Sequence, residues 1–359
     1  MIKKKTPCHV LGAAAWKTRC LTLVAALVAV ATPAHSQESD KSLNYQSSGT
    51  TGLMVFDPGL NIDVEPILPL PLTESLNLNP KKVALGEKLF NDKSLSADGK
   101  FACETCHLVD KGMTDQKAHS PAIDGKDRDL NTPTMFNIGE MKLLTWSGKR
   151  SNLGDVAEAV FKSKKGLAIE MPDLVKRLEA NAEYKSLFGA VYDNGVQVEN
   201  VKDAIAEYMR SLNTPNSRFD KYLRGDTGAL TKEEREGYQL FKEYGCSSCH
   251  QGVNIGGNMM APAGIFGNFI KDRGNETTAD LGLYNKTGNL GDKYVFRVPT
   301  LRNIELTHPY LHDGSADSLE KAVDIMGRYM LGRDLPVSDI DLIVKFLKTL
   351  TGEYKGKQL

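Results

Sequence analysis

The sequence contains the pentapeptide Cys-x-x-Cys-His twice, and the two copies start 143 residues apart. Two cysteines at this spacing, followed at once by a histidine, are typical of covalent attachment of a c-type haem. The thiols form thioethers with the haem vinyl groups, and the adjacent histidine then lies where it can bind the iron. The chain therefore predicts two haem c groups. The attachment residues are Cys103, Cys106 and His107 for the first haem, and Cys246, Cys249 and His250 for the second.

A zinc site is the alternative, because two Cys-x-x-Cys segments can supply four thiolates to one ion. The histidine that follows both copies favours haem over zinc. Of the six cysteines in the chain, only Cys8 and Cys20 lie outside the two motifs.

The first 36 residues have the pattern of a secretory signal peptide. The lysines Lys3–Lys5 precede the apolar run Leu21–Ala31, and Ala34–Ser36 is a small-x-small cleavage site. The apolar run is too short to span a membrane, which disfavours the alternative of a retained N-terminal anchor. We therefore expect cleavage, loss of Cys8 and Cys20, and a periplasmic location, since c-type attachment in bacteria occurs outside the cytoplasm.

The composition of the chain is balanced in charge. It has 45 basic and 45 acidic residues among 359, and so a formal net charge of zero. This balance argues against a nucleic-acid partner and offers no long-range steering field.

The surroundings of the two motifs repeat. Gly86-x-x-Leu89-Phe90 precedes the first motif, and Gly237-x-x-Leu240-Phe241 precedes the second. Downstream, Pro133–Ile138 matches Pro299–Ile304, and the halves then align without a gap as far as Leu153 and Leu319. This pattern indicates one haem-binding module used twice.

The aligned halves differ at positions that matter for iron. Trp146 in the first half is aligned with His312 in the second, and Val160 is aligned with Met326. Methionine is a common sixth ligand of c-type haem, whereas valine cannot bind iron. We therefore expect a closed His250/Met326 electron-transfer haem and a first haem with an open face. Rival ligands for the second iron are Met330, Met259 and Met260.

Apolar residues at spacings of three and four predict an all-α fold. The expected helices cover 82–91, 153–162, 171–190, 199–213, 231–244, 318–330 and 337–350. Thr231 and Glu234 predict a capping box, and Ser338 is expected to cap the last helix. We expect two cytochrome c-like domains in tandem after the signal peptide (1–36). Their boundaries are 37–215 for the peroxidatic domain and 216–359 for the electron-transfer domain, with the boundary segment at Asn213–Ser217.

The longest distinctive strings resemble those of the bacterial di-haem cytochrome c peroxidases, a family that includes the MauG-type enzymes. These strings are Asn131–Thr134, Cys246–Asn258 and Val298–Gly314. The resemblance covers nearly all of the mature chain. It implies an enzyme in which the second haem receives electrons and the first reduces hydrogen peroxide, with calcium between the two domains.

The resemblance also implies roles for individual residues. It matches Met326 to the methionine ligand of the electron-entry haem, Trp146 to the tryptophan between the haems, and Glu170 to the glutamate above the peroxidatic iron. A desolvated carboxyl with a raised pKa can move a proton between the peroxide oxygens. The calcium ligands implied by position are Asn131 and the backbone carbonyls of Thr307 and Pro309.

Three residues depart from the pattern of the family. Many members carry a histidine 16 residues after the first proximal histidine, where this chain has Ile123. Val156 replaces a common glutamine, and Thr145 replaces the aromatic residue before the tryptophan. The first departure favours a site that is open without reductive activation, although His119 in the same loop could still bind the first iron.

The main prediction is therefore a periplasmic peroxidase that takes electrons from a small monohaem cytochrome or copper protein. Two alternatives remain: a MauG-like oxidase of protein side chains, and a non-enzymatic di-haem electron carrier. Homodimers are common among the relatives, which is an argument by analogy. Arg302 is expected to pair with a haem propionate, and His312 to tune the surroundings of the second haem.

Overall fold

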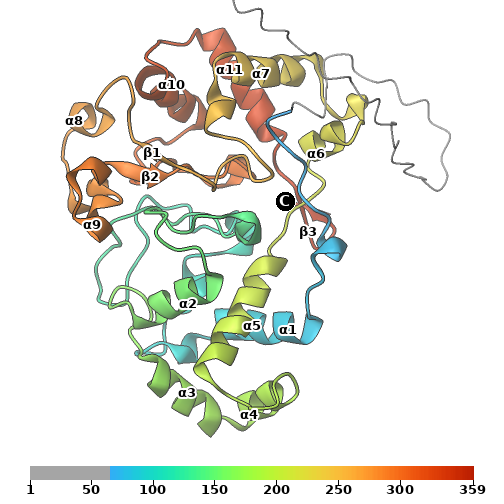
Figure 1. Cartoon of the computed structure of the whole chain (residues 1–359), viewed down its shortest axis with the longest axis vertical. Helices are drawn as coiled ribbons and strands as arrows, with labels where there is room; N and C mark the ends of the chain where they lie inside the picture. The colour runs from blue at the N-terminus through green and yellow to red at the C-terminus, as the bar shows by residue number, and fades with distance from the viewer. Residues whose placement is uncertain (1–64) are drawn as a thin grey trace, which may run out of the picture. The chain divides into compact units, whose positions relative to one another are not determined.

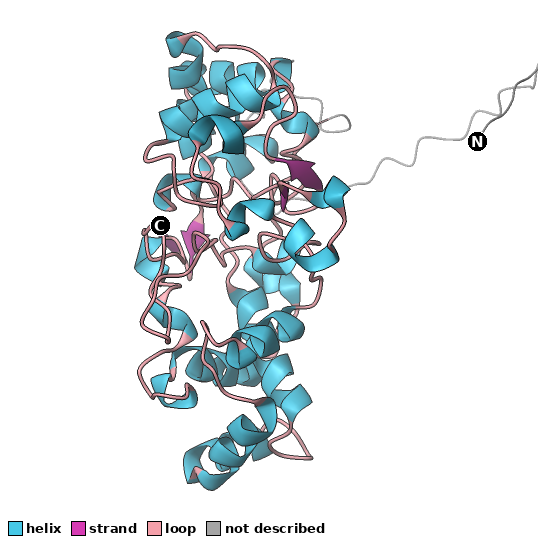
Figure 2. Cartoon of the chain, turned by 90° about the vertical axis from the view of Figure 1, so that its left-hand side faces the viewer, coloured by secondary structure: helices cyan, strands magenta, loops and turns pink. Residues whose placement is uncertain are grey.

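The computed structural model describes residues 65–359, so the expected signal peptide lies outside the described residues. Helices joined by long loops make up most of this part of the chain (Figure 2). The main helices are α1 (Pro80–Asn91), α2 (Leu153–Lys162), α3 (Met171–Ala180), α4 (Ala182–Gly189), α5 (Val198–Ser211), α6 (Arg218–Leu223), α7 (Lys232–Glu243), α10 (Leu319–Met330) and α11 (Val337–Lys348). Two shorter helices are α8 (Phe269–Arg273) and α9 (Tyr284–Thr287).

Strands are few in the described residues. β1 (Met260–Pro262) pairs antiparallel with β2 (Val295–Arg297), and β3 (Glu353–Tyr354) pairs with β4 (Lys357–Gln358). The predicted helical class is therefore confirmed, with these two small ribbons added. No helix within residues 65–359 is long and apolar enough to cross a bilayer.

Most helix boundaries agree with the periodicity of the sequence, with one clear exception. The expected helix over 171–190 is two helices, because Asn181 interrupts it. The Asn181 side chain accepts hydrogen bonds from the backbone N–H groups of Glu183 and Tyr184, and so it caps α4. An asparagine that bonds its own backbone in this way competes with helix continuation.

The two predicted helix caps have different outcomes. The capping box of α7 is present, since Thr231 Oγ1 accepts from the Glu234 N–H and the Glu234 carboxylate accepts from the Thr231 N–H. The expectation for Ser338 is wrong. Pro336 precedes the first turn of α11 and supplies no side-chain hydrogen bond, and Ser338 lies inside the helix.

Two apolar cores follow the two halves of the repeat. The first is centred on the packing of α1 against α5, and the second on the packing of α7 against α11 (Figure 1). Equivalent glycines allow each helix pair to approach closely. A Cβ on Gly86 would lie 2.0 Å from the Ala204 carbonyl oxygen, and a Cβ on Gly237 would lie 2.0 Å from that of Leu342. The glycine of each Gly-x-x-Leu-Phe segment therefore lies where its helix packs closely against a partner helix, α1 against α5 and α7 against α11.

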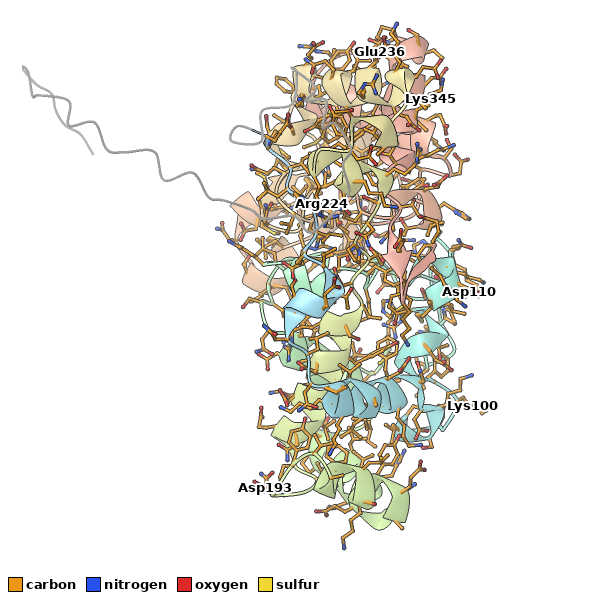
Figure 3. All side chains as sticks on the ribbon, turned by 90° about the vertical axis from the view of Figure 1, so that its right-hand side faces the viewer. Lys100, Asp110, Asp193, Arg224, Glu236 and Lys345 are labelled. Carbon is orange, nitrogen blue, oxygen red and sulfur yellow. The ribbon has the colours of Figure 1, made fainter. Side chains whose placement is uncertain are left out.

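The exposed side of the α7–α11 pair carries charged residues. Two of them, Glu236 on α7 and Lys345 on α11, are labelled in Figure 3. Lys345 forms an ion pair with Glu233. Exposed pairs of this kind contribute little to stability, so the buried crossing is what holds the two helices together.

The repeated asparagines occupy the same backbone conformation in both halves. Asn137 and Asn303 have φ of 59° and 58°, in the left-handed region that asparagine tolerates. The side chains of both donate to Thr214 Oγ1, at 2.7 Å and 2.9 Å. The segment around Thr214, expected as a domain boundary, is thus buried and bonded to both halves. The domain limits themselves stay a prediction.

Candidate haem sites and the seam between them

Both Cys-x-x-Cys-His motifs fold into a tight turn. A short 3-10 helix begins at Cys103 in the first motif and at Cys246 in the second. The backbone N–H of His107 donates to the Cys103 carbonyl at 3.1 Å, and that of His250 donates to Cys246 at 2.9 Å. The four cysteines of the motifs form no disulfide. Each turn therefore brings two thiols and one imidazole to the same place.

The histidines of the two motifs are oriented as metal ligands require. His107 Nδ1 lies 3.0 Å from the Met113 carbonyl oxygen, and His250 Nδ1 lies 3.3 Å from that of Ile255. A protonated Nδ1 that donates to a carbonyl leaves Nε2 free for iron. Burial lowers the pKa of both imidazoles to about 4, so both are neutral at physiological pH. This geometry fits haem ligation at both motifs.

The seam between the halves consists of the loops 143–148 and 309–314, the strand β2 and Asn131. Trp146 lies in this seam. Its indole Nε1 donates to the Asn131 carbonyl at 2.7 Å. Its ring meets the His312 ring edge to face, with centroids 6.4 Å apart, and it meets Phe296 in the same manner at 6.5 Å. The ring of His312 is stacked on Phe296 at 4.3 Å.

The two halves exchange equivalent backbone hydrogen bonds across the seam. Asn131 N–H donates to the His312 carbonyl at 2.8 Å, and Arg297 N–H donates to the Trp146 carbonyl at 2.8 Å. Asn131 and Arg297 are themselves aligned in the repeat, as are Trp146 and His312. The tryptophan and its aligned histidine are thus held in contact by a reciprocal arrangement, which the sequence alone does not reveal.

His312 belongs to a charged cluster behind the seam. Its Nε2 lies 2.7 Å from Asp280 Oδ1, and Arg273 forms ion pairs with both Asp280 and Asp313. These ion pairs and the Thr277 bonds hold the pKa of the buried Asp280 carboxyl well below its usual range, although burial opposes the shift. Asp280, His312 and Asp313 lie close enough to hold a metal ion. Arg273 already supplies their positive charge, so the cluster is complete without one.

The expected sixth ligand of the second iron lies on α10. Met326 is half-buried there, and Val160 holds the aligned position on α2. Among its rivals, Met260 on β1 is engaged in the seam, since a Cβ on Gly148 would lie 2.2 Å from its Sδ. The assignment of Met326 stays a prediction.

Glu170 lies at the start of α3 and its side chain is exposed. The segment before it is fixed to the end of α2, because Leu167 N–H donates to Val160 at 3.0 Å and Ile169 N–H donates to Phe161 at 2.9 Å. Glu170 is therefore the next residue after a segment whose backbone is hydrogen-bonded to Val160 and Phe161 at the end of α2. Its catalytic role is untested and stays a prediction.

The other residues singled out in the sequence lie in the loop after the first motif and on α2. His119 is exposed, and Ile123 is half-buried in the same loop. Val156 on α2 packs against the first core. Ligation of the first iron by His119 remains untested.

The segments that carry the expected calcium ligands lie side by side. The Asn131 side chain donates to the Lys117 carbonyl at 2.9 Å. A Cβ on Gly314 would touch both Ala118 and Pro309, and one on Gly112 would touch Thr307. The grouping agrees with a shared site for Asn131, Thr307 and Pro309, but calcium itself stays a prediction.

The two fully buried arginines of the described residues differ in their partners. Arg302 forms an ion pair with Asp220 at 2.7 Å and donates to the Leu68 and Val253 carbonyls. These contacts contradict the expectation that Arg302 pairs with a haem propionate, since its charge is already matched. Arg297, which sequence reasoning missed, has no carboxylate partner within residues 65–359.

Comparison with known sequences gives a consistent result. Residues 80–228 match the profile of the family described as di-haem cytochrome c peroxidase. The chain is 40% identical over 291 residues to cytochrome c peroxidase Ccp of Escherichia coli and covers 62% of that protein's length. It is 37% identical to cytochrome c551 peroxidase of Nitrosomonas europaea, with 84% of this chain and 89% of that protein aligned.

MauG-type proteins are more distant. Methylamine utilization protein MauG of Methylophilus methylotrophus is 25% identical over 79% of this chain and 86% of its own length. The crystal structure of a MauG-like protein associated with microbial copper homeostasis superposes with a TM-score of 0.69 at 26% identity, over 83% of this chain and 96% of that one.

Proposed function

The chain belongs to the di-haem cytochrome c peroxidase family and is an enzyme of the peroxidase class, and on that premise we propose that it reduces hydrogen peroxide to water in the periplasm. Its electrons come from a small monohaem cytochrome or a copper protein. The observation that carries this proposal is that the two halves of the repeat share one fold but differ at the position expected to hold the sixth iron ligand. α10 offers a thioether at Met326 where α2 offers only the hydrocarbon of Val160.

The residues of each half hold one haem in this proposal. Cys103, Cys106 and His107 would bind the group in the peroxidatic module (37–215), and Cys246, Cys249 and His250 the group in the electron-transfer module (216–359). When bound, the haems would supply the iron needed to carry electrons and to cleave the O–O bond of peroxide.

Trp146 is proposed as the electron relay between the two sites. Its Nε1 bond to Asn131 and its ring contacts with His312 and Phe296 hold the indole in one orientation inside the seam. A fixed orientation is what a relay needs, because the coupling between redox centres depends on stable contacts.

Glu170 is proposed as the group that moves a proton between the two peroxide oxygens. Reduction of one peroxide to two waters consumes two electrons and two protons. A carboxyl group positioned beside the reacting oxygens can accept a proton from one of them and pass it to the other. The bonds of Leu167 and Ile169 to α2 support this role, since they hold the Glu170 segment beside Val160.

Calcium is proposed as a structural ion at Asn131, Thr307 and Pro309.

A MauG-like oxidase of protein side chains is the second candidate function, and the MauG-like crystal structure favours it. The peroxidases named above are the closer in sequence, at 37–40% identity against 25–26%, so peroxide reduction is preferred.

Steady-state turnover of hydrogen peroxide with a reduced monohaem cytochrome tests the proposal, alongside the absorption and EPR spectra of the oxidised protein. We expect turnover, one high-spin haem and one low-spin haem. Two low-spin haems in both redox states, without turnover, would show an electron carrier instead.

A further inference from the structure

Arg297 is a buried cation whose counter-charge is missing from the described polypeptide. Its side chain is 3% exposed. Nε donates to the Thr145 carbonyl at 2.9 Å, Nη1 makes a long contact of 3.5 Å with the Val298 carbonyl, and Nη2 has no partner among residues 65–359. Burial lowers the pKa of the guanidinium to about 10, so the group is still charged at neutral pH.

Arg302, the other buried arginine of the described residues, has a carboxylate partner. It is 1% exposed, and its charge is matched by the Asp220 carboxylate at 2.7 Å. A buried charge without a partner costs several kcal/mol, and proteins avoid this cost by pairing or neutralisation. Arginine neutralises least readily of all side chains. Arg297 therefore indicates a carboxylate that residues 65–359 do not supply.

Arg297 lies where the two halves of the repeat meet. It is the last residue of β2, and its N–H and Nε are bonded to the carbonyls of Trp146 and Thr145 in the first half. Two residues further on, the Pro299 carbonyl contacts the His250 imidazole. The hydrogen bonds of Arg297 to the first half thus lie in the seam, and each haem carries two carboxylates.

The repeat supports the same conclusion. Arg297 is aligned with Asn131, and the two residues make equivalent backbone bonds across the seam.

We propose that Arg297 pairs with a haem propionate in the seam, and that it raises the reduction potential of that haem. This inference rests on the proposed di-haem function, but it concerns a property that is measured without turnover. A guanidinium beside a haem favours the ferrous state, which has one positive charge less than the ferric state. It also keeps the propionate ionised, because a charge-assisted pair stabilises the carboxylate.

Redox titration of the purified di-haem protein, followed separately at each haem, tests the proposal. In Arg297→Gln we expect the reduction equilibrium of one haem to shift about tenfold toward the ferric state, a fall of about 59 mV for one electron. Arg297→Lys keeps the charge and should shift it less than about threefold. The haem whose potential shifts, the first or the second, is the one whose propionate pairs with Arg297.

A pH series separates the pairing from a structural role. The unpaired propionate in Arg297→Gln has a higher pKa, so the potential of the same haem should become dependent on pH near neutrality. Lys149→Gln is the matched control, since Lys149 is an exposed cation at the end of the same loop as Trp146. Water and salt screen it, and the potentials should be unchanged.

Three results would overturn the proposal: unchanged potentials of both haems in Arg297→Gln, an equal fall in Arg297→Lys, or an equal fall in Lys149→Gln. If Arg297→Gln fails to retain both haems, resonance Raman spectra of the wild-type protein replace it. A propionate bonded to N–H donors shifts its bending frequency on exchange into deuterated water, and no shift at either haem would exclude the pair. The redox titrations and Raman spectra do not depend on peroxide turnover. The proposed peroxidase function and the proposed pairing of Arg297 can therefore be disproved independently of each other.

Discussion

The indole of Trp146 and the imidazole of His312 meet edge to face, with their ring planes at 75° and centroids 6.4 Å apart. The two residues hold the same position in the two halves of an internal repeat, so the repeat places its own divergent residues in contact. Asn131 and Arg297 fix this contact through equivalent backbone hydrogen bonds. The seam is thus a nearly symmetric structure with unequal side chains.

Met326 is expected to be the sixth ligand of the second iron. Met326→Val copies the first half into the second and should convert the low-spin haem to high-spin, with a lower potential, because thioether ligation is lost. EPR and redox titration of the oxidised protein measure both effects. Met330→Leu, four residues along the same helix, is the control and should leave the spectrum unchanged. Conversion by the Met330 variant alone would reassign the ligand.

Trp146 is expected to carry electrons between the sites. Trp146→Phe keeps an aromatic ring but removes the Nε1 bond to Asn131, a loss of about 1 kcal/mol in stability. We expect transfer from the second haem to the first to slow by about tenfold or more, measured by stopped flow after reduction of one haem. Phe296→Leu, which changes the ring beside Trp146, is the comparison. Equal rates in wild type and Trp146→Phe would show that the indole only packs.

Glu170 is expected to move a proton during cleavage of the O–O bond. Glu170→Gln keeps the shape of the side chain and removes its acid–base function, so peroxide turnover should fall by about 10²–10⁴-fold. Asp173→Asn, an acidic residue in the first turn of the same helix, is the matched control and should retain full activity. Retained turnover in the Gln variant would exclude Glu170 from the mechanism.

Gly314 is expected to be required by the packing of the seam. A Cβ there would lie 2.7 Å from Ala118 Cα, whereas one on Gly99 would meet nothing within 4 Å. The two glycines have nearly the same φ, 68° and 69°. Gly99→Ala should therefore cost only the left-handed strain of about 1–2 kcal/mol in free energy of unfolding. Gly314→Ala should cost about 1–3 kcal/mol more, from overpacking. Chemical denaturation measures both, and equal losses would contradict a tight seam.

Asp280 is expected to make stability depend on acid pH. Its pKa in the folded protein is lowered below the ordinary value of 3.8, because Arg273, His312 and Thr277 stabilise the carboxylate. Its contribution is complete well above that value and is lost as the pH falls through it toward the folded pKa. Denaturation at pH 7 and pH 3 should show a smaller acid loss in Asp280→Asn than in wild type. Identical losses would place the acid sensitivity elsewhere.

Much of the fold was predictable because its signals are local. Apolar spacing located α2 at Leu153–Lys162 without error, and Thr231 with Glu234 marked the start of α7. The same approach missed α6, α8 and α9, which span too few turns to show a period. It also joined α3 to α4, because apolar spacing does not reveal that the Asn181 side chain bonds its own backbone.

The sequence by itself determined the chemistry that depends on neighbours in the chain. Cys103 to His107 and Cys246 to His250 form their turns from adjacent residues, so the spacing within each motif is enough to identify two haem sites. The tertiary structure decided which charges find partners. Arg302 meets an aspartate 82 residues away, and Arg297 meets none in the described chain. Contacts over such separations depend on how the two halves pack, and residue type alone does not encode them.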